Sequence, residues 1–422
     1  MKRFLLLTWL LLAAIPARAD LNIVIDEGVS GALPIAVVPF KTSGQLPVDV
    51  TALVAADLKR SGLFDPLPQD RMLAKPSRPE DVQLQNWRAA DVDNLVVGEI
   101  TQVEGGSYNI RFHLIDVYRG KQVIGYDVPA TQNGLRSGAH RVADFVFQAL
   151  TGQRGVFNTR IAYITANGQP GQRTFELIVA DADGHDPRAV VRSGEPLMSP
   201  AWSPDRRKMA YVAFDDGESA IFIHELRSGV ARELVRKPGI NGAPAWSPDG
   251  SKIAAALSFG GDPEIYVMNV DGTGERRITN SSAIDTEPTW SPDGQKIAFT
   301  SDRGGQPQIY EVDLASGDTR RLTFEGRSNA RAQYSPDGKN LILVNLDEQG
   351  YRIGVQELDT RQMRILSRGP LDESPSFAPN GRVIMYARQG GQLATATTDG
   401  RVRQTLSQQG TVREPAWSPY LN

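Results

Sequence analysis

The side chains that could do chemistry in this chain lie a few residues before six recurring aromatic residues. Carboxylates dominate them, and Glu287 and Glu414 stand at the same place, three residues before Trp290 and Trp417. Oxygen ligands of this kind suit Ca²⁺, but about six to eight of them must converge. The sequence therefore leaves open whether calcium or water lies between them. Around a bound metal ion, Glu287 or Glu414 could act as ligand or base, which would suit a metal-dependent hydrolase.

The aromatic residues mark a repeat, so equivalent positions can be compared. They open the motifs WSPD, WSPDG, YSPDG, FAPNG and WSPY, and successive copies lie 44, 44, 44, 43 and 40 residues apart. The aromatic residues are Trp202, Trp246, Trp290, Tyr334, Phe377 and Trp417. The position two before the aromatic is nearly always proline, whereas the three positions before that one differ between copies. A position that serves the fold should look alike in every copy, but one that contacts an asymmetric partner need not.

The variable positions therefore predict a partner-binding surface. Its residues are Asn241, Gly242, Ala243, Asp285, Thr286, Glu287, Arg331, Asp372, Glu373 and Glu414. The alternative is that they are solvated loop residues, since loops carry polar side chains in any case. The repeated SPDG segment has a simpler explanation, because these residue types suit successive positions of a type I turn. The aromatic side chain before it supplies apolar area for packing.

A period in the low forties suits four short strands, the size of one propeller blade. In the third unit we expect strands at 285–290, 296–301, 308–313 and 319–324, because these runs are β-branched and bounded by turn formers. Before the first aromatic residue, strands are expected at 160–165, 175–181 and 188–192, and a lone last strand at 412–417. The count predicts a six-bladed β-propeller in which the C-terminal strand completes the first blade and removes its exposed edge.

The first half lacks this period and predicts a small α/β domain. Strands are expected at 34–40 and 94–99, a hairpin is expected around Arg119 and Gly120, and helices are expected at 48–61 and 136–150. The predicted fold class is thus α+β with two domains. The predicted division is a signal peptide at 1–19, a mobile N-terminal segment at 20–33, the α/β domain at 34–151, a linker at 152–159 and the propeller at 160–422.

The first residues are typical of a secretory signal peptide. Lys2 and Arg3 precede an apolar run at 4–15, and an A-x-A site predicts cleavage between Ala19 and Asp20. No later stretch is apolar for long enough to span a bilayer, and the chain has no cysteine with which to form disulfides. Cleavage would change the formal charge from −3 to −6. An acidic surface argues against a nucleic-acid partner.

The segment that follows, LNIVIDEGVSG, is a second candidate binding site. It combines a strand-like apolar run with glycines, and its candidate binding residues are Leu21, Ile23, Val24, Ile25, Asp26 and Gly28. Such a segment could add a strand to a partner's sheet. It could also dock on its own protein, and the competition between the two would make a switch. The plain alternative is an edge strand of the first domain, since termini often dock.

Other catalytic patterns are missing from the sequence. The four histidines are scattered without the spacing of a zinc site, and we interpret them as structural or surface residues. The chain has no G-x-S-x-G motif and no cysteine nucleophile. Its Gly-Gly pairs fall between expected strands and are interpreted as turns rather than phosphate-binding loops.

The chain resembles the TolB family, periplasmic components of the Tol-Pal cell-envelope system of Gram-negative bacteria. The resemblance covers nearly the whole mature chain and rests on IVIDEGVSGALPIAVVPF, NGAPAWSPDGSKIA, TEPTWSPDG, LDESPSFAPNG and the ending PAWSPYL. It implies a non-enzymatic periplasmic adaptor, monomeric outside its complexes, that serves outer-membrane integrity and envelope constriction at cell division.

The resemblance also implies two partners. The propeller mouth would bind the peptidoglycan-associated lipoprotein Pal, through a surface that includes residues 241–243, Thr286 and Glu287. The mature N-terminus would bind the inner-membrane protein TolA.

Overall fold

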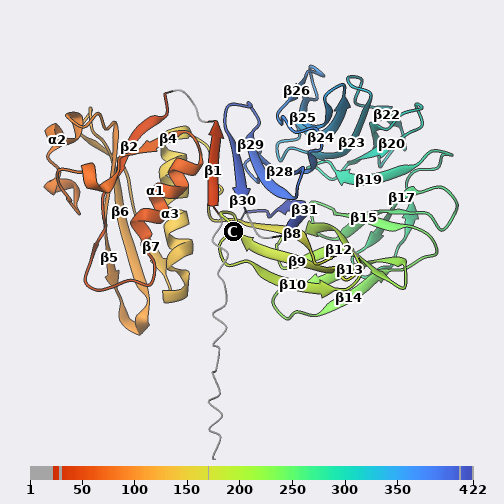
Figure 1. Cartoon of the computed structure of the whole chain (residues 1–422), viewed down its shortest axis with the longest axis horizontal. Helices are drawn as coiled ribbons and strands as arrows, with labels where there is room; N and C mark the ends of the chain where they lie inside the picture. The colour runs from red at the N-terminus through yellow and green to blue at the C-terminus, as the bar shows by residue number, and fades with distance from the viewer. Residues whose placement is uncertain (1–21, 28–30, 170, 408–409, 421–422) are drawn as a thin grey trace, which may run out of the picture.

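The computed structural model describes residues 22–27, 31–169, 171–407 and 410–420. A small α/β domain lies beside a six-bladed β-propeller, with β1 (Asn22–Glu27) between them (Figure 1). This arrangement confirms the predicted fold class. Among the described residues, no helix has the length and apolar character needed to cross a membrane. The predicted signal peptide and its cleavage site at Ala19 and Asp20 fall outside them.

The α/β domain is built on a mixed sheet. Its strand order is β4-β2-β5-β6-β7, and β3 also pairs with β5. The strands are β2 (Leu33–Val37), β3 (Lys41–Thr42), β4 (Phe64–Pro66), β5 (Asn94–Gln102), β6 (Tyr108–Asp116) and β7 (Lys121–Ala130). β2 runs parallel to β4 and β5, whereas β5, β6 and β7 are antiparallel neighbours. The predicted hairpin is therefore formed by β6 and β7.

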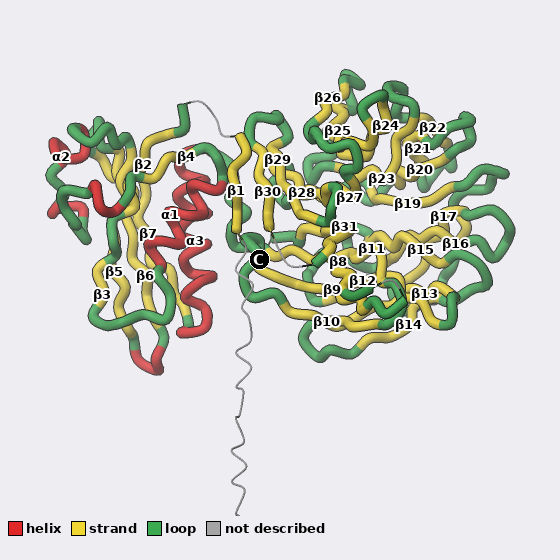
Figure 2. The backbone as a smooth tube through the Cα atoms, in the orientation of Figure 1, coloured by secondary structure: helices red, strands yellow, loops and turns green. Residues whose placement is uncertain are grey.

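Helices cover one face of this sheet and separate it from the propeller (Figure 2). They are α1 (Val50–Arg60) and α3 (Leu135–Thr151), while the short α2 (Leu84–Arg88) lies at the far side of the domain. The side chain of Asp49 begins α1 by accepting a hydrogen bond from the Ala52 N–H at 2.9 Å. Gly152 ends α3 in the left-handed conformation, with φ at 73°. Short 3₁₀ turns lie at Gln69–Arg71, Pro79–Asp81, Glu104–Gly106 and Gln132–Gly134.

The propeller consists of six antiparallel sheets, each with four propeller strands. Blade one holds β31 (Thr411–Trp417), β8 (Arg160–Asn167), β9 (Thr174–Asp181) and β10 (Arg188–Ser193); blade two holds β11 (Leu197–Trp202), β12 (Lys208–Asp215), β13 (Glu218–Glu225) and β14 (Ala231–Val235). Blade three holds β15 (Asn241–Trp246), β16 (Lys252–Leu257), β17 (Glu264–Asn269) and β18 (Arg276–Arg277); blade four holds β19 (Asp285–Trp290), β20 (Lys296–Ser301), β21 (Gln308–Asp313) and β22 (Thr319–Arg321). Blade five holds β23 (Ser328–Tyr334), β24 (Asn340–Asp347), β25 (Gly350–Glu357) and β26 (Met363–Ile365); blade six holds β27 (Glu373–Phe377), β28 (Val383–Arg388), β29 (Gln392–Thr397) and β30 (Arg403–Ser407).

The C-terminal strand closes the ring, as the repeat predicted. β31 pairs with β8 from Thr411 opposite Ala166 to Trp417 opposite Ile161. Just beyond β31, the Ser418 N–H donates to the Arg160 carbonyl at 2.9 Å, and the Ser418 hydroxyl accepts from the Arg160 N–H at 3.0 Å. Each inner strand ends at its repeated aromatic residue.

The repeated turn and tryptophan build contacts within and between blades. The Ser247 hydroxyl donates to Asp249 at 2.5 Å and accepts from the Lys252 N–H at 2.9 Å, while Gly250 has a φ of 72°. The hydrogen bond from Ser247, followed by those from the N–H and hydroxyl of Ser251, lowers the pKa of Asp249 to about 2. The Trp246 indole N–H reaches the Ala201 carbonyl of the preceding blade at 3.1 Å. The indole thus adds a directed hydrogen bond to the apolar packing expected of it.

The junction between the domains is held by α3. The Asp144 carboxylate accepts the N–H groups of Phe157 and Asn158 at 2.9 and 3.2 Å. Val156 and Phe157 are buried, so residues 152–159 are fixed against both domains.

Removal of β31 tests how much the closing strand stabilises the ring. A chain ending at Gly410 loses the buried Val412 and the partly buried Trp417, and the loss of Trp417 alone should cost about 3 kcal/mol. The melting temperature should therefore fall by at least about 6 °C, measured by circular dichroism. A chain ending at Tyr420 is the control and should melt like the full chain. Equal melting temperatures for the Gly410 and Tyr420 chains would contradict this role.

Candidate functional site

A backbone kink turns one residue of every inner strand toward the propeller axis. The residue three before each aromatic has φ between 49° and 54°, and the pairing register of each inner strand breaks there. These residues, here called the channel ring, are Ser199, Ala243, Glu287, Arg331, Ser374 and Glu414. Together with the residues that follow them, mostly prolines, they line a cavity of about 160 Å³. A residue other than glycine rarely adopts the left-handed backbone conformation, so its recurrence in six blades identifies a β-bulge that is a regular feature of this fold.

The charged members of the channel ring form ion pairs with one another. The Arg331 guanidinium lies 2.9 Å from Glu287 and 3.5 Å from Glu414, and it also donates to the Ser374 hydroxyl. The second Glu287 oxygen accepts from the Arg331 N–H at 2.9 Å and from Thr300 at 2.8 Å. These contacts hold the charges in a fixed arrangement before any partner arrives.

Arg331 lies between the carboxylates for which the sequence left a bound calcium ion as a possibility. Burial opposes the charge of its guanidinium, but Glu414 and Glu287 outweigh that effect and raise its pKa above the usual value. The carboxylates of the predicted surface do not all converge, since Asp285 pairs instead with Arg303 at 2.7 Å. An arginine between two glutamates is itself the counter-charge, which disfavours a divalent cation at this point.

Three residues of the predicted surface lie beneath it. Asn241, Asp285 and Asp372, five positions before their aromatics, are each 0% exposed. Asn241 accepts from the Lys237 N–H at 2.9 Å and donates to the Ser219 carbonyl at 2.9 Å. Burial raises the pKa of both Asp285 and Asp372, despite the hydrogen bonds they accept. These three side chains have no surface with which to touch a partner here, and they hold the mouth loops in place.

The other predicted residues reach the surface. Gly242, Thr286 and the channel-ring residues are partly exposed or line the cavity, and Glu373 is exposed at the rim. The partner-binding role of this group stays a prediction, because the geometry shows only where the residues lie.

Sequence reasoning missed an apolar component of the same mouth. Six positions before the aromatic, Ile240, Ile284 and Leu371 are about half exposed, at 52%, 50% and 50%. The Ser258 N–H donates a hydrogen bond to the Ile240 carbonyl, and this brings the next residue, Phe259, close to Ile240. We call the apolar crown the set Met198, Ile240, Phe259, Ile284, Tyr351 and Leu371. Counting one position further upstream would have found its central members, and exposed apolar groups of this kind mark interaction sites.

The N-terminal segment is paired with the propeller. β1 runs antiparallel to β30, the outer strand of blade six, from Asn22 opposite Ser407 to Glu27 opposite Arg403. The ladder breaks between Ile25 and Glu27, so Asp26 has no opposite residue. The alternative of an edge strand of the first domain is wrong, because the sheet that β1 joins is a propeller blade. Leu21 and Gly28 lie outside the described residues.

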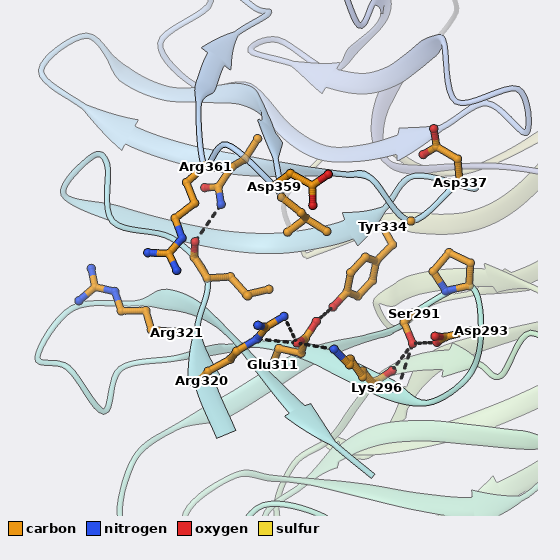
Figure 3. A pocket seen from close by; sticks show the side chains of 15 residues that line it. Ser291, Asp293, Lys296, Glu311, Arg320, Arg321, Tyr334, Asp337, Asp359 and Arg361 are labelled. Carbon is orange, nitrogen blue, oxygen red and sulfur yellow. Dashed lines mark hydrogen bonds and ion pairs between the residues drawn. The ribbon is translucent and has the colours of Figure 1, made fainter. Parts of the chain in front are cut away.

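A larger hollow of about 540 Å³ lies between blades four and five (Figure 3). It opens where the repeated aromatic is Tyr334 instead of tryptophan, and the Tyr334 hydroxyl donates to the buried Glu311 at 2.5 Å. Burial and then Glu311 raise the pKa of Tyr334, so it stays a neutral donor. Four acidic and four basic side chains line the hollow, and Arg320 and Lys296 reach Glu311 at 2.8 and 3.4 Å. Its charges are balanced internally, which suits a blade-to-blade joint rather than a catalytic centre.

One histidine is not isolated, contrary to the impression of scattering in the sequence. His140 lies with Asp57 and Asp183 at the boundary between the domains, and their ligand atoms fall within 4.8 Å of one another. Of the others, His224 is buried in β13, which lowers its pKa, while His113 and His185 lie at polar surfaces.

Comparisons with known proteins cover both domains. Residues 147–421 match the family described as TolB beta propeller domain, and residues 21–123 match TolB amino-terminal domain. The Tol-Pal system protein TolB of Thioalkalivibrio sulfidiphilus (strain HL-EbGR7) is 58% identical over 430 residues, covering 100% of this chain and 99% of that protein. That of Methylococcus capsulatus (strain ATCC 33009 / NCIMB 11132 / Bath) is 59% identical over 411 residues, covering 97% of each. The crystal structure of TolB from Acinetobacter baumannii is similar, with a TM-score of 0.87 and 40% identity over 95% of this chain and 100% of that one.

Replacing the central arginine tests the charge balance of the channel. Arg331→Gln leaves Glu287 and Glu414 facing each other and should lower the free energy of unfolding by about 1–3 kcal/mol, because the three side chains are partly solvated. Denaturant unfolding measures the loss, and the double variant Arg331→Gln/Glu287→Gln should recover part of it. Arg413→Gln, at an exposed arginine of the same mouth, is the control.

Calcium binding in the channel can be tested on the unchanged protein. Millimolar CaCl₂ should shift the melting temperature of the unchanged protein no more than MgCl₂ does, since Arg331 fills the position between the glutamates. A calcium-specific rise in the unchanged protein would show that the arginine does not replace a cation.

Proposed function

Because the chain belongs to the TolB family of the Tol-Pal system, we propose that its propeller mouth binds the lipoprotein Pal and that its N-terminal segment binds TolA. The chain is a non-enzymatic protein of the cell envelope. The proposal places it in the periplasm after cleavage between Ala19 and Asp20. There it acts as an adaptor for outer-membrane integrity and for envelope constriction at division.

One observation supports the mouth as the Pal site. The apolar crown lies at the end of the blades where the inner strands begin, as does the channel ring, whose charges are already paired. Protein interfaces commonly combine a desolvated apolar part with fixed polar groups. Because the Arg331 contacts are formed in advance, a partner would not have to order these side chains, which reduces the free-energy cost of association.

The geometry divides the proposed mouth residues into two roles. Direct contact is proposed for the residues that are at least partly exposed, together with the apolar crown. These residues are Gly242, Ala243, Thr286, Glu287, Arg331, Glu373 and Glu414. A supporting role is proposed for the buried residues Asn241, Asp285 and Asp372, which hold the loops that present the crown.

The N-terminal segment suits strand exchange with TolA. The main chain of β1 is paired only along β30 in the described sheet, so it lies at an edge. A partner that adds a strand would offer the same kind of main-chain hydrogen bonds. Binding of TolA through Leu21–Gly31 would thus compete with docking on blade six.

A charge placed in the apolar crown tests the mouth. Ile284→Asp introduces an unpaired carboxylate at the proposed interface and should weaken binding to purified Pal by about tenfold or more. Isothermal titration calorimetry measures the dissociation constant, with Glu287→Ala as a second variant. Val230→Asp is the matched control, because Val230 is 61% exposed at a turn between β13 and β14.

Two results would contradict the mouth assignment. One is unchanged affinity for Ile284→Asp, Ile240→Asp and Leu371→Asp alike. The other is an equal loss of affinity in the Val230→Asp control, which would indicate a general effect of added charge.

Deletion of the N-terminal segment tests the second partner. A mature chain that starts after Gly31 should lose binding to the periplasmic part of TolA in a pull-down, because it lacks the proposed strand. It should keep the Pal affinity measured above, which shows that the propeller is intact. Normal TolA binding by the shortened chain would refute the N-terminal assignment.

A further inference from the structure

A buried ionic cluster joins the α/β domain to the propeller. His140 of α3 lies 2.5 Å from Asp57 of α1 through Nδ1 and 3.8 Å from Asp183 of the propeller through Nε2. Arg60 pairs with Asp57 at 2.8 Å. Arg136 contacts Asp183 and also lies 3.5 Å from Asp181. His140 and Asp57 are each 2% exposed.

The charges of this cluster balance only when His140 carries a proton. Asp57, Asp181 and Asp183 face Arg60 and Arg136, so the imidazolium supplies the third positive charge. Two further groups face the cluster, Asp144 from α3 and Arg160 from β8. Burial raises the pKa of Asp144 to about 6, so these two charges offset each other fully only above that pH. His185, from the same propeller loop as Asp183, is solvated and lies 4.0 Å from Asp181.

A proton suits this position better than a metal ion. The Asp57 and Asp183 carboxylates already accept hydrogen bonds from Arg60 and Arg136. A divalent cation would add its charge beside two guanidinium groups, which is unfavourable in a buried site. His140 Nδ1 and Asp57 Oδ2 lie within hydrogen-bond distance, and a proton on the imidazole would make this hydrogen bond charge-assisted.

Apolar packing between the domains is incomplete, which raises the weight of the ionic contacts. A cavity of about 280 Å³ lies at the boundary, lined by residues of both domains that include Phe147, Phe157 and Leu406. Arg60 also lines this cavity, and its carbonyl accepts a hydrogen bond from Gln404 of β30. The cluster is thus connected to the blade that carries β1.

We propose that His140 and its partners form a protonation-dependent latch between the two domains. The His140 imidazolium attracts Asp183 across the boundary and holds the α/β domain on the propeller. Loss of its proton leaves one uncompensated negative charge in a buried site, which loosens the contact between the domains.

The direction of the pH dependence follows from the surroundings of His140. Burial alone would lower the pKa of the imidazole, but Asp57 and then Asp183 outweigh it and raise the pKa above the ordinary value of about 6.5. A raised pKa means that the stabilisation is fully present below about pH 6.5 and is lost as the pH rises through the folded-state pKa. The latch is therefore closed below about pH 6.5 and opens as the pH rises through the folded-state pKa of His140.

Two measurements on the full mature chain test the latch. The chain has four histidines, so imidazole resonances can be assigned by single substitution and titrated by NMR. The chain also lacks cysteine, so Thr101→Cys and Ser228→Cys, one exposed site in each domain, accept spin labels for distance measurement. We expect His140 to titrate above about pH 6.5 and the distance distribution to broaden over the same pH range.

Variants separate the latch from a simple structural role. His140→Gln should give, at about pH 6, the broad distribution that the unchanged protein shows at about pH 9. Asp183→Asn removes the carboxylate that the imidazolium attracts across the boundary, so its distribution should no longer narrow when His140 gains its proton. His185→Gln is the control and should behave like the unchanged protein.

Three outcomes would overturn the latch. One is a distance distribution that stays constant while His140 loses its proton. A second is a narrow distribution for His140→Gln at about pH 6. The third is a pH-dependent narrowing in Asp183→Asn like that of the unchanged protein, which keeps the proposal testable if His140→Gln does not fold.

Discussion

The left-handed residue in each inner strand is the constraint on which the mouth depends. It breaks the ladder of every blade at the same place, with φ between 49° and 54°. This break directs one side chain per blade toward the axis, where it lines the central cavity and does not pack in a blade core. The position is therefore free to differ between blades, which explains why serine, alanine, glutamate and arginine all occur there. A functional surface can vary on a repeated frame because the bulge separates the two tasks.

Two ionic clusters in this protein use the same chemistry with different consequences. In the channel, the cation is Arg331, whose guanidinium stays charged across the physiological range, so its ion pairs with Glu287 and Glu414 do not depend on its protonation. At the domain boundary, the third cation is His140, whose charge depends on pH. The first arrangement would fix the proposed binding surface in advance, while the second would make the proposed domain contact depend on pH. The difference lies in one titratable side chain.

Sequence periodicity was sufficient for the architecture and insufficient for the mouth. The spacing of the aromatic residues predicted the blades and their closure by β31, because each unit packs the same kind of aromatic residue at the end of its inner strand. Asn241, Asp285 and Asp372 were grouped with exposed neighbours because the bulge interrupts the alternation of a regular strand, and a sequence does not reveal the bulge. The pair of His140 and Asp57 is separated by 83 residues and lies where α1 and α3 meet the propeller. No local pattern encodes such a contact.

Blade six connects features that are far apart in the sequence. Its inner strand β27 contains Glu373 and Ser374 of the mouth. Its outer strand β30 pairs with β1 along the edge that faces away from β29. Gln404 of β30 also reaches Arg60 at the end of α1, next to the ionic cluster of His140. The proposed partner at the mouth and the proposed partner of the N-terminal segment would therefore contact the same sheet as the α/β domain does. Because that sheet is a single hydrogen-bonded unit, a shift of β30 changes the support of β27 through only two intervening strands, β28 and β29.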